Sequence, residues 1–146
     1  MAMGTMTAER HCTAATEIVA DVVLAGGGMA GMTLACALGG AGVRVAVIEP
    51  LPAVTRTDAA FDGRTSAIAA GSKSVLDAVG AWAGIAPDAQ PILDIRVSDG
   101  DSPLFLHYDR EAAGAGPMGW IVENRHIRGA LIARLRALPT VTLVDG

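Results

Sequence analysis

Apolar residues in the first third of the chain fall into short blocks separated by glycines. Ile18–Ala25 is a β-branched apolar block of the kind found in buried strands, interrupted only by Asp21. A glycine-rich turn follows over 26–31, and the small apolar residues of Met29–Leu38 predict a short helix. Val43–Ile48 predicts a second buried strand. The pattern therefore predicts a strand–turn–helix–strand unit.

The middle of the chain changes character after the second predicted strand. Pro50–Phe61 contains prolines and predicts a loop. Ala67–Trp82 is amphipathic and predicts a helix, with Thr65 or Ser66 as its N-cap. We therefore expect a loop and a helix where a simple dinucleotide domain would place a helix and a third strand.

Two alternating segments then predict a hairpin. Ile92–Asp99 alternates from Leu93 onward, a turn signal follows at 99–101, and Leu104–Tyr108 alternates again. A bare nucleotide-binding unit has no place for this hairpin, so we interpret about 92–108 as an insertion. His107 falls on its polar face and is expected to be a solvated histidine.

The last segments return to the α/β pattern. After a flexible loop over 112–119, Trp120–Val122 predicts a short strand, Arg125–Leu138 an amphipathic helix and Val141–Val144 a buried strand. The arginines of the predicted helix Arg125–Leu138 are expected to lie on a solvated face of that helix. A doubly wound sheet needs more strands and helices on both faces. We therefore expect 18–146 to be the N-terminal part of a larger α/β domain.

Composition narrows the class of protein. The chain is 51% hydrophobic and 18% charged, with a net charge of -4, which argues against a surface that coats nucleic acid. Val22–Val43 is a run of 22 uncharged residues, long enough to span a membrane. Its seven glycines and the adjacent Arg44 argue against a span. No transmembrane segment is predicted.

The N-terminal residues give an expectation about location. Residues 1–17 include three charges and lack an apolar signal-peptide region, so we expect a disordered leader and a protein of the reducing cytoplasm. Cys12 and Cys36 are too few for a disulfide framework and fit no zinc spacing, so no metal site is predicted. Cys36 is expected to be a packed thiol.

The glycine-rich turn carries the first chemical signal. Gly26, Gly28 and Gly31 form a Gly-x-Gly-x-x-Gly pattern directly after a predicted strand and at the start of a helix. Gly26 allows a sharp turn, Gly28 lets a pyrophosphate approach the backbone, and Gly31 allows close packing of helix and strand. The N–H groups around Met29 and Ala30 then face the phosphates. The turn predicts a dinucleotide site.

Two charged residues refine this prediction. Glu49 follows Gly31 by 18 residues, where a carboxylate accepts hydrogen bonds from ribose hydroxyls and repels a 2′-phosphate. The site therefore suits FAD or NAD and not NADP. Arg64, just ahead of the predicted helix, is well placed to reach a phosphate or a flavin ring edge. A solvated loop arginine is the alternative.

Longer motifs resemble one enzyme family. Gly26–Ala35, Asp62–Ala69, Gly80-x-Trp82 and Gly119–Ile127 together resemble the flavin-dependent hydroxylases of ubiquinone biosynthesis, and the likeness runs from about Asp21 to Gly146. The resemblance implies an α/β fold: a Rossmann-like FAD-binding domain of the glutathione-reductase type, truncated, with an inserted hairpin. It also implies that Arg64 contacts FAD and that Asn124 lies near the ribityl and pyrophosphate groups. Arg125 is the alternative to Asn124, because a shift of one residue in the helix start exchanges them.

The family's activity supplies the functional expectation. By resemblance, the parent protein hydroxylates a polyprenylated phenol with FAD, O₂ and NADH or NADPH, and the cofactor supplies the chemistry, so no catalytic residue is predicted in this chain. Its partners would be this lipophilic substrate and O₂, with no nucleic acid. Peripheral contact with a membrane or a quinone-biosynthesis complex stays open. The other hypotheses are a different FAD-dependent oxidoreductase and a non-enzymatic NAD-binding regulatory module.

Overall fold

The computed structural model describes residues 17–58, 60, 62–100, 103–109, 111, 114 and 116–146. Apart from Glu17, the predicted leader lies outside the described residues, as does Cys12. Residues 112, 113 and 115 of the loop predicted over 112–119 are also outside them.

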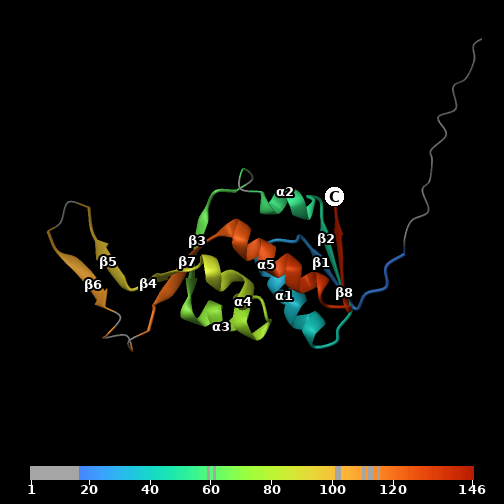
Figure 1. The fold of residues 1–146 in the computed structure, drawn as a ribbon, viewed down its shortest axis with the longest axis horizontal. Helices are drawn as coiled ribbons and strands as arrows, with labels where there is room; N and C mark the ends of the chain where they lie inside the picture. The colour runs from blue at the N-terminus through green and yellow to red at the C-terminus, as the bar shows by residue number, and fades with distance from the viewer. Residues whose placement is uncertain are drawn as a thin grey trace, which may run out of the picture.

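A three-stranded parallel sheet forms one end of the molecule. Its strands are β1 (Val22–Ala25), β2 (Val45–Glu49) and β8 (Val141–Asp145), in the order β1-β2-β8. Helices α1 (Met29–Gly40) and α5 (Asn124–Arg136) pack against each other and against this sheet (Figure 1). The predicted strand–turn–helix–strand unit is confirmed, and helix α1 extends two residues beyond the predicted end.

The core lies between the sheet and these two helices. Met32, Leu131 and Leu135 are buried there against Val45 and Val47 of β2. Cys36 is also packed into this core, as predicted, and its burial raises the pKa of the thiol to about 11. On the opposite face of the sheet, Val23 is 65% exposed. The helices therefore cover one face of the parallel sheet.

A second, antiparallel sheet lies beside the start of α5. Its strands are β3 (Thr65–Ala69), β7 (Gly119–Glu123) and β4 (Gln90–Ile92), in the order β3-β7-β4. Helices α3 (Ala70–Ala78) and α4 (Trp82–Ile85) follow β3 along the chain, and a 3₁₀ turn at Ala86–Asp88 leads to β4.

The helix predicted over Ala67–Trp82 was wrong at its beginning and at its end, because α3 ends at Ala78 and a separate helix, α4, begins at Trp82. Residues Thr65 to Ala69 form β3, which pairs with β7 from Thr65 opposite Glu123 to Ala69 opposite Gly119. Helix α3 begins only at Ala70, and neither Thr65 nor Ser66 is its N-cap. A strand 50 to 58 residues away along the chain supplies the hydrogen bonds that hold this segment extended, which the local pattern does not reveal.

The loop predicted over Pro50–Phe61 contains a short helix. Helix α2 (Ala53–Thr57) begins after Pro52, and its first N–H, from Ala53, donates to Asp145 Oδ2 at 2.7 Å. The prediction was therefore wrong over these five residues. The carboxylate of Asp145, 92 residues away along the chain, accepts the first N–H of this helix, and the local sequence does not reveal that contact.

The predicted hairpin is present. Strands β5 (Asp94–Ser98) and β6 (Phe105–Asp109) pair with Ile95 opposite Tyr108 and Val97 opposite Leu106. These four residues share one face, and His107 lies opposite Arg96 on the other. Figure 1 shows the hairpin reaching away from the helices. Its description as an insertion stays a prediction.

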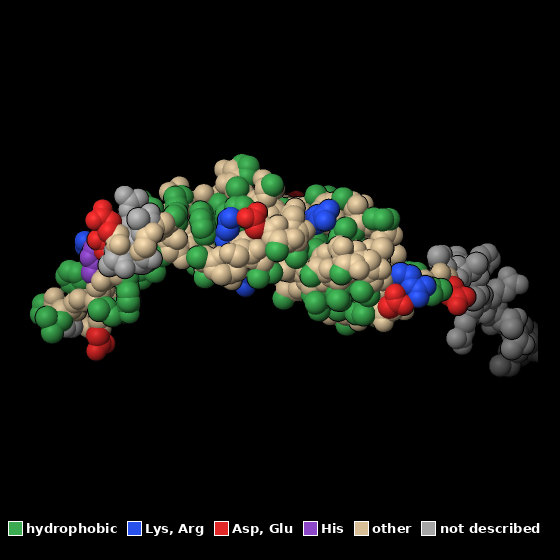
Figure 2. All heavy atoms as spheres, turned by 90° about the horizontal axis from the view of Figure 1, so that it is seen from below, with side chains coloured by type: hydrophobic (Ala, Val, Ile, Leu, Met, Phe, Trp, Pro, Cys, Tyr) green, Lys and Arg blue, Asp and Glu red, His purple; other side chains and the backbone are tan. Residues whose placement is uncertain are grey.

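The described surface agrees with the composition. No helix in the described part of the chain has the length and hydropathy needed to cross a bilayer. On the face seen in Figure 2, basic side chains are scattered and several lie beside acidic ones. That face carries no broad positive patch.

Candidate cofactor-binding site

The glycine-rich turn after β1 has the geometry that its sequence predicts. Gly26 has φ +103°, a left-handed conformation, and its N–H donates to the carbonyl of Ile48 at 2.8 Å. A Cβ on Gly31 would lie 2.6 Å from the carbonyl oxygen of Gly26. The turn and the close approach of α1 to β1 therefore both depend on glycine.

The start of α1 is open to a ligand. Gly28 is the N-cap of α1, and a Cβ placed on it would have no atom within 4 Å. No side chain caps this helix, and its first turn holds no acidic residue. The N–H groups of Met29, Ala30 and Gly31, at the N-terminus of α1, therefore have no capping side chain as acceptor. Such a helix N-terminus favours the binding of an anion.

Glu49 lies beside this turn at the end of β2. Its Oε2 accepts the N–H of Gly27 at 2.8 Å, and its Oε1 accepts the N–H of Leu51 at 3.1 Å. The two bonds fix the carboxylate next to the helix start while the residue stays partly exposed. Each oxygen keeps further acceptor capacity, so Glu49 can bind hydroxyl groups there.

Arg56 is a site residue that the sequence did not single out. Its side chain, only 4% exposed, lies behind the turn, where Nη1 donates to the carbonyl of Gly27 at 2.7 Å and Nε to that of Leu51 at 3.0 Å. Nη2 lies 3.7 Å from Asp145 Oδ2. A Cβ on Gly27 would lie 3.0 Å from Nη1. Arg56 therefore fixes the back of the turn and leaves no room for a side chain at Gly27.

Arg64 precedes β3 and is 79% exposed, but its inner edge is fixed. Its Nε donates to Asp62 Oδ1 at 2.8 Å and its Nη2 to Asp62 Oδ2 at 3.0 Å. The main-chain N–H of Arg64 also donates to Oδ1, at 3.1 Å. The result is a two-bond pairing between a buried carboxylate and an exposed guanidinium.

The start of α5 completes this cluster. Asn124 is buried at the first position of α5; its Nδ2 donates to Asp62 Oδ2 at 3.2 Å, and Ser66 donates to its Oδ1 at 2.6 Å. Arg128 donates to the same Asp62 oxygen at 2.6 Å. We call these five residues, Asp62, Arg64, Ser66, Asn124 and Arg128, the Asp62 cluster.

The helix start decides which of the two predicted residues joins Arg64. Since α5 begins at Asn124, Asn124 lies in the Asp62 cluster, and its main-chain N–H donates to the carbonyl of Arg64 at 3.0 Å. Arg125 pairs instead with Glu123 at 2.7 Å. The structure therefore brings Asn124, and not Arg125, together with Arg64.

Asp62 is held in its ionised form. The hydrogen bonds from Arg64, then those from Arg128 and Asn124, lower the pKa of Asp62 far below its ordinary value, against the opposing effect of burial. Hydrogen bonds to a carboxylate favour its charged form. The cluster therefore carries one negative and two positive charges.

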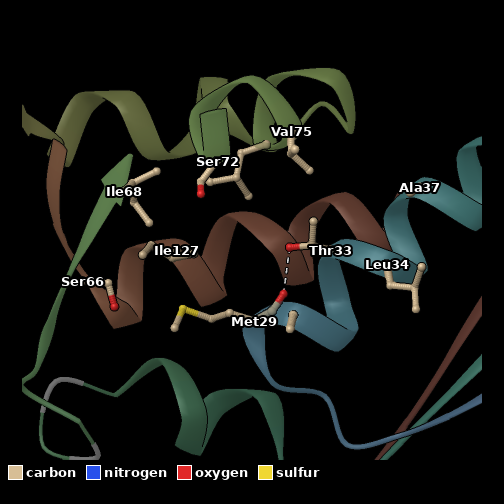
Figure 3. A pocket seen from close by; sticks show the side chains of 11 residues that line it. Met29, Thr33, Leu34, Ala37, Ser66, Ile68, Ser72, Val75 and Ile127 are labelled. Carbon is tan, nitrogen blue, oxygen red and sulfur yellow. Dashed lines mark hydrogen bonds between the residues drawn. The ribbon is translucent and has the colours of Figure 1, made fainter. Parts of the chain in front are cut away.

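A pocket of about 550 Å³ joins the two parts of the site. Its walls come from α1, β3, α3 and the start of α5, and they are mostly apolar (Figure 3). Met29 and Ala30 line it at the start of α1, and Ser66 of the Asp62 cluster lines it on β3. Figure 3 shows the Met29 side chain extending toward Ser66. The pocket therefore runs between the helix start and the Asp62 cluster.

Weak sequence signals existed for some of the missed residues. Ser66 lies two residues after Arg64, as side chains on one face of an extended segment do, and Arg128 lies one helical turn after Asn124 on the same face of α5. Asp62 was visible only as part of a motif. Nothing local marks Arg56 as buried.

The comparisons with known proteins agree with one another. A family described as "FAD binding domain" matches residues 19–129. The ubiquinone hydroxylase UbiL of Rhodospirillum rubrum is 50% identical over 132 residues, which cover 90% of this chain and 30% of that protein. The 3-demethoxyubiquinol 3-hydroxylase of Escherichia coli is 34% identical over 125 residues, 84% of this chain and 32% of that protein.

A solved structure gives the same picture of the fold. The crystal structure of p-nitrophenol 4-monooxygenase PnpA from Pseudomonas putida superposes with a TM-score of 0.66 and 26% identity, covering 89% of this chain and 32% of that one. The chain thus spans about a third of the length of the proteins that it matches.

The described residues fit FAD. The open space at Gly28 and the uncapped start of α1 suit a pyrophosphate, and Glu49 beside them suits ribose hydroxyls. The pocket supplies an apolar wall, and the Asp62 cluster, which lines the pocket through Ser66, holds an exposed cation.

Proposed function

Because the chain belongs to the FAD binding domain family, we propose that it forms the FAD-binding part of a ubiquinone-biosynthesis monooxygenase. The reaction is the hydroxylation of the aromatic ring of a polyprenylated phenol. NADH or NADPH is the electron donor and O₂ the oxygen source. The names of the two relatives support this proposal, because each name describes a hydroxylase of ubiquinone or of a ubiquinol precursor.

One observation carries the assignment of the nucleotide end. The carboxylate of Glu49 lies 2.8 Å from the N–H of Gly27, beside a helix start that has no side-chain cap. N–H donors that can bind an anion and a carboxylate that can accept hydrogen bonds from hydroxyl groups are thus adjacent. The pyrophosphate and the ribose of an ADP group require these two kinds of group. Gly26, Gly28, Met29, Ala30, Gly31 and Glu49 form this end of the proposed site.

The flavin end of the proposed site is the pocket with the Asp62 cluster. Arg64 and Asn124 are its cofactor-binding residues, and Ser66 and Asp62 hold them. Arg125 is left out, because it pairs with Glu123 and not with a residue of the Asp62 cluster. The mostly apolar wall of the pocket suits a ring system.

The bound FAD supplies the redox and oxygen-transfer chemistry. The residues of this chain bind and orient it: the start of α1 neutralises phosphate charge, Glu49 fixes the ribose, and Arg64 presents N–H donors. No side chain described here is assigned a role as nucleophile or general base.

The proposed substrate also bears on location. A polyprenylated phenol is lipophilic, so the enzyme must collect it from a membrane or from a partner that carries it. We propose a cytoplasmic protein without a spanning helix, and peripheral contact with a membrane or a quinone-biosynthesis complex is the open alternative.

The cofactor assignment is tested by thermal unfolding of the 146-residue chain with FAD, NAD or no ligand. A ligand present at a hundred times its dissociation constant stabilises the folded state by about 2.7 kcal/mol. We expect FAD to raise the melting temperature by about 5–10 °C and NAD to leave it unchanged. Protection by NAD alone would favour the regulatory-module hypothesis.

The activity is tested on the intact gene product loaded with FAD. We expect NAD(P)H oxidation that depends on a polyprenylated phenol, and a product that carries one more oxygen atom by mass spectrometry. An FAD-loaded protein that leaves every such phenol unchanged would contradict the hydroxylase assignment and leave the FAD assignment standing.

A further inference from the structure

The Asp62 cluster has an arrangement that a surface ion pair does not need. A single carboxylate, 6% exposed, receives bonds from two arginines and an asparagine. The three donors come from two places in the chain, the segment before β3 and the first two turns of α5. Asp62 therefore fixes the position of Arg64 relative to Asn124.

Arg64 keeps hydrogen-bond donors that Asp62 does not use. A guanidinium has five N–H groups. Nε and one N–H of Nη2 are bound to Asp62, so both N–H groups of Nη1 and one of Nη2 are left for a ligand. The side chain is 79% exposed, so this outer edge is accessible.

The charge of the cluster also suits this use. If only Asp62 and Arg64 were present, their charges would cancel. Because Arg128 binds the same carboxylate, the cluster keeps a net positive charge. An arginine whose charge is shared in this way still attracts a phosphate or an electron-rich ring edge.

We propose that Asp62 is a positioning residue, which holds Arg64 by its inner edge so that its outer edge faces FAD. The inference rests on the proposed function, since FAD is the ligand. An unrestrained arginine samples many rotamers, and fixing it on binding costs conformational entropy. Asp62 removes that cost before the cofactor arrives.

The chain contains a matched pair outside the site. Asp21, just before β1, receives the main-chain N–H, Nε and Nη2 of Arg44 at 3.1, 3.0 and 2.6 Å. These are the same three donor groups that Arg64 offers to Asp62. This pair lies at the beginning of β1, whereas the glycine-rich turn follows its end, and both side chains are about half exposed. Asp21→Asn therefore controls for the loss of an acid–arginine pair as such.

The test is a double-mutant cycle on the dissociation constant of FAD, measured by flavin fluorescence on the intact gene product that contains this chain. Asp62→Asn should weaken binding by about tenfold in the wild-type background and by less than about twofold in the Arg64→Ala background. Asp62→Glu, which restores the carboxylate, should recover most of the affinity. Asp21→Asn should change the dissociation constant in neither background.

A second variant covers the case in which Asp62→Asn fails to fold. Arg64→Lys keeps the charge of an exposed side chain but lacks the fork that binds Asp62 and a ligand at once. It should bind FAD about as weakly as Arg64→Ala, with a circular dichroism spectrum and melting temperature like those of the wild type.

The outcomes separate this inference from the proposed function. The positioning role would be overturned if Asp62→Asn or Arg64→Lys bound FAD with wild-type affinity. It would also be overturned if Asp62→Asn weakened FAD binding equally in the wild-type and Arg64→Ala backgrounds. Neither result would contradict FAD binding itself. An intact wild-type protein that binds no FAD would instead overturn the proposed function, and this inference with it.

Discussion

The two ends of the proposed site use an arginine and a carboxylate in opposite ways. At the glycine-rich turn the arginine is buried: Arg56 binds the carbonyl groups of Gly27 and Leu51, while Glu49 stays partly exposed. In the Asp62 cluster the carboxylate is buried and Arg64 is exposed. One end therefore presents a negative acceptor and the other a positive donor.

This difference indicates how one elongated ligand is oriented. Ribose hydroxyls need acceptors, whereas phosphates and an electron-rich ring edge need donors or positive charge. The buried partner at each end serves mainly to hold its exposed counterpart or the adjacent backbone. A ligand that binds across both ends must match both charges, which is a stronger selection than either end provides alone.

Gly31→Ala would damage the turn end most. The new Cβ would lie 2.6 Å from the carbonyl oxygen of Gly26, so the backbone must move. We expect a loss of about 2–4 kcal/mol in unfolding free energy, measured by urea denaturation, and no measurable FAD binding. Gly28→Ala is the matched control, because its Cβ would meet no atom within 4 Å. It should keep the stability and lose FAD affinity; the reverse result would contradict the geometry of the turn.

Arg56→Ala tests the buried cation of the same end. Its loss leaves the carbonyl of Gly27 without its 2.7 Å donor and opens a cavity beside Met32. We expect unfolding to become easier by about 2–3 kcal/mol, measured by the same denaturation experiment. Arg44→Ala removes an exposed arginine and should change the midpoint little. Equal effects of the two substitutions would show that Arg56 is not held as the structure has it.

Acid titration tests the buried carboxylate of Asp62, in the Asp62 cluster, and should give the smallest change in stability of these experiments. The folded-state pKa of Asp62 lies below its ordinary value of 3.8, so in acid the unfolded chain binds more protons than the folded one. Its stabilising contribution is therefore complete above about pH 5 and is lost as the pH falls below about 4. The difference in melting temperature between wild type and Asp62→Asn should shrink in that range. A difference that stays constant down to pH 3 would mean that Asp62 gains nothing from its charge.

The turn end could be predicted from the sequence because its determinants are local. Three glycines, two β-branched strands and Glu49 lie within about 30 residues, and each acts through backbone geometry that its type dictates. The hairpin was predictable for the same reason, since alternation alone assigns Ile95 and Val97 to one face.

The Asp62 cluster could be predicted only in part, because it is assembled by distant residues. Asp62 is separated from Asn124 by 62 positions and from Arg128 by 66. Strand β3 is held extended by its pairing with β7, which lies far away in the sequence. Its own short apolar sequence therefore predicted the start of a helix. Arg64 was singled out by its position and by resemblance to a family, and Asn124 by the resemblance alone, but only the fold shows that Asp62 joins them. Arg56 was missed because arginine is rarely buried.

The central claim is that both ends bind FAD through opposite charges. The most direct measurement is the dissociation constant of FAD for the wild type, Glu49→Ala and Arg64→Ala, by equilibrium dialysis with melting curves as a check on folding. We predict that each substitution weakens binding by about tenfold or more. Wild-type affinity after either substitution would contradict the claim.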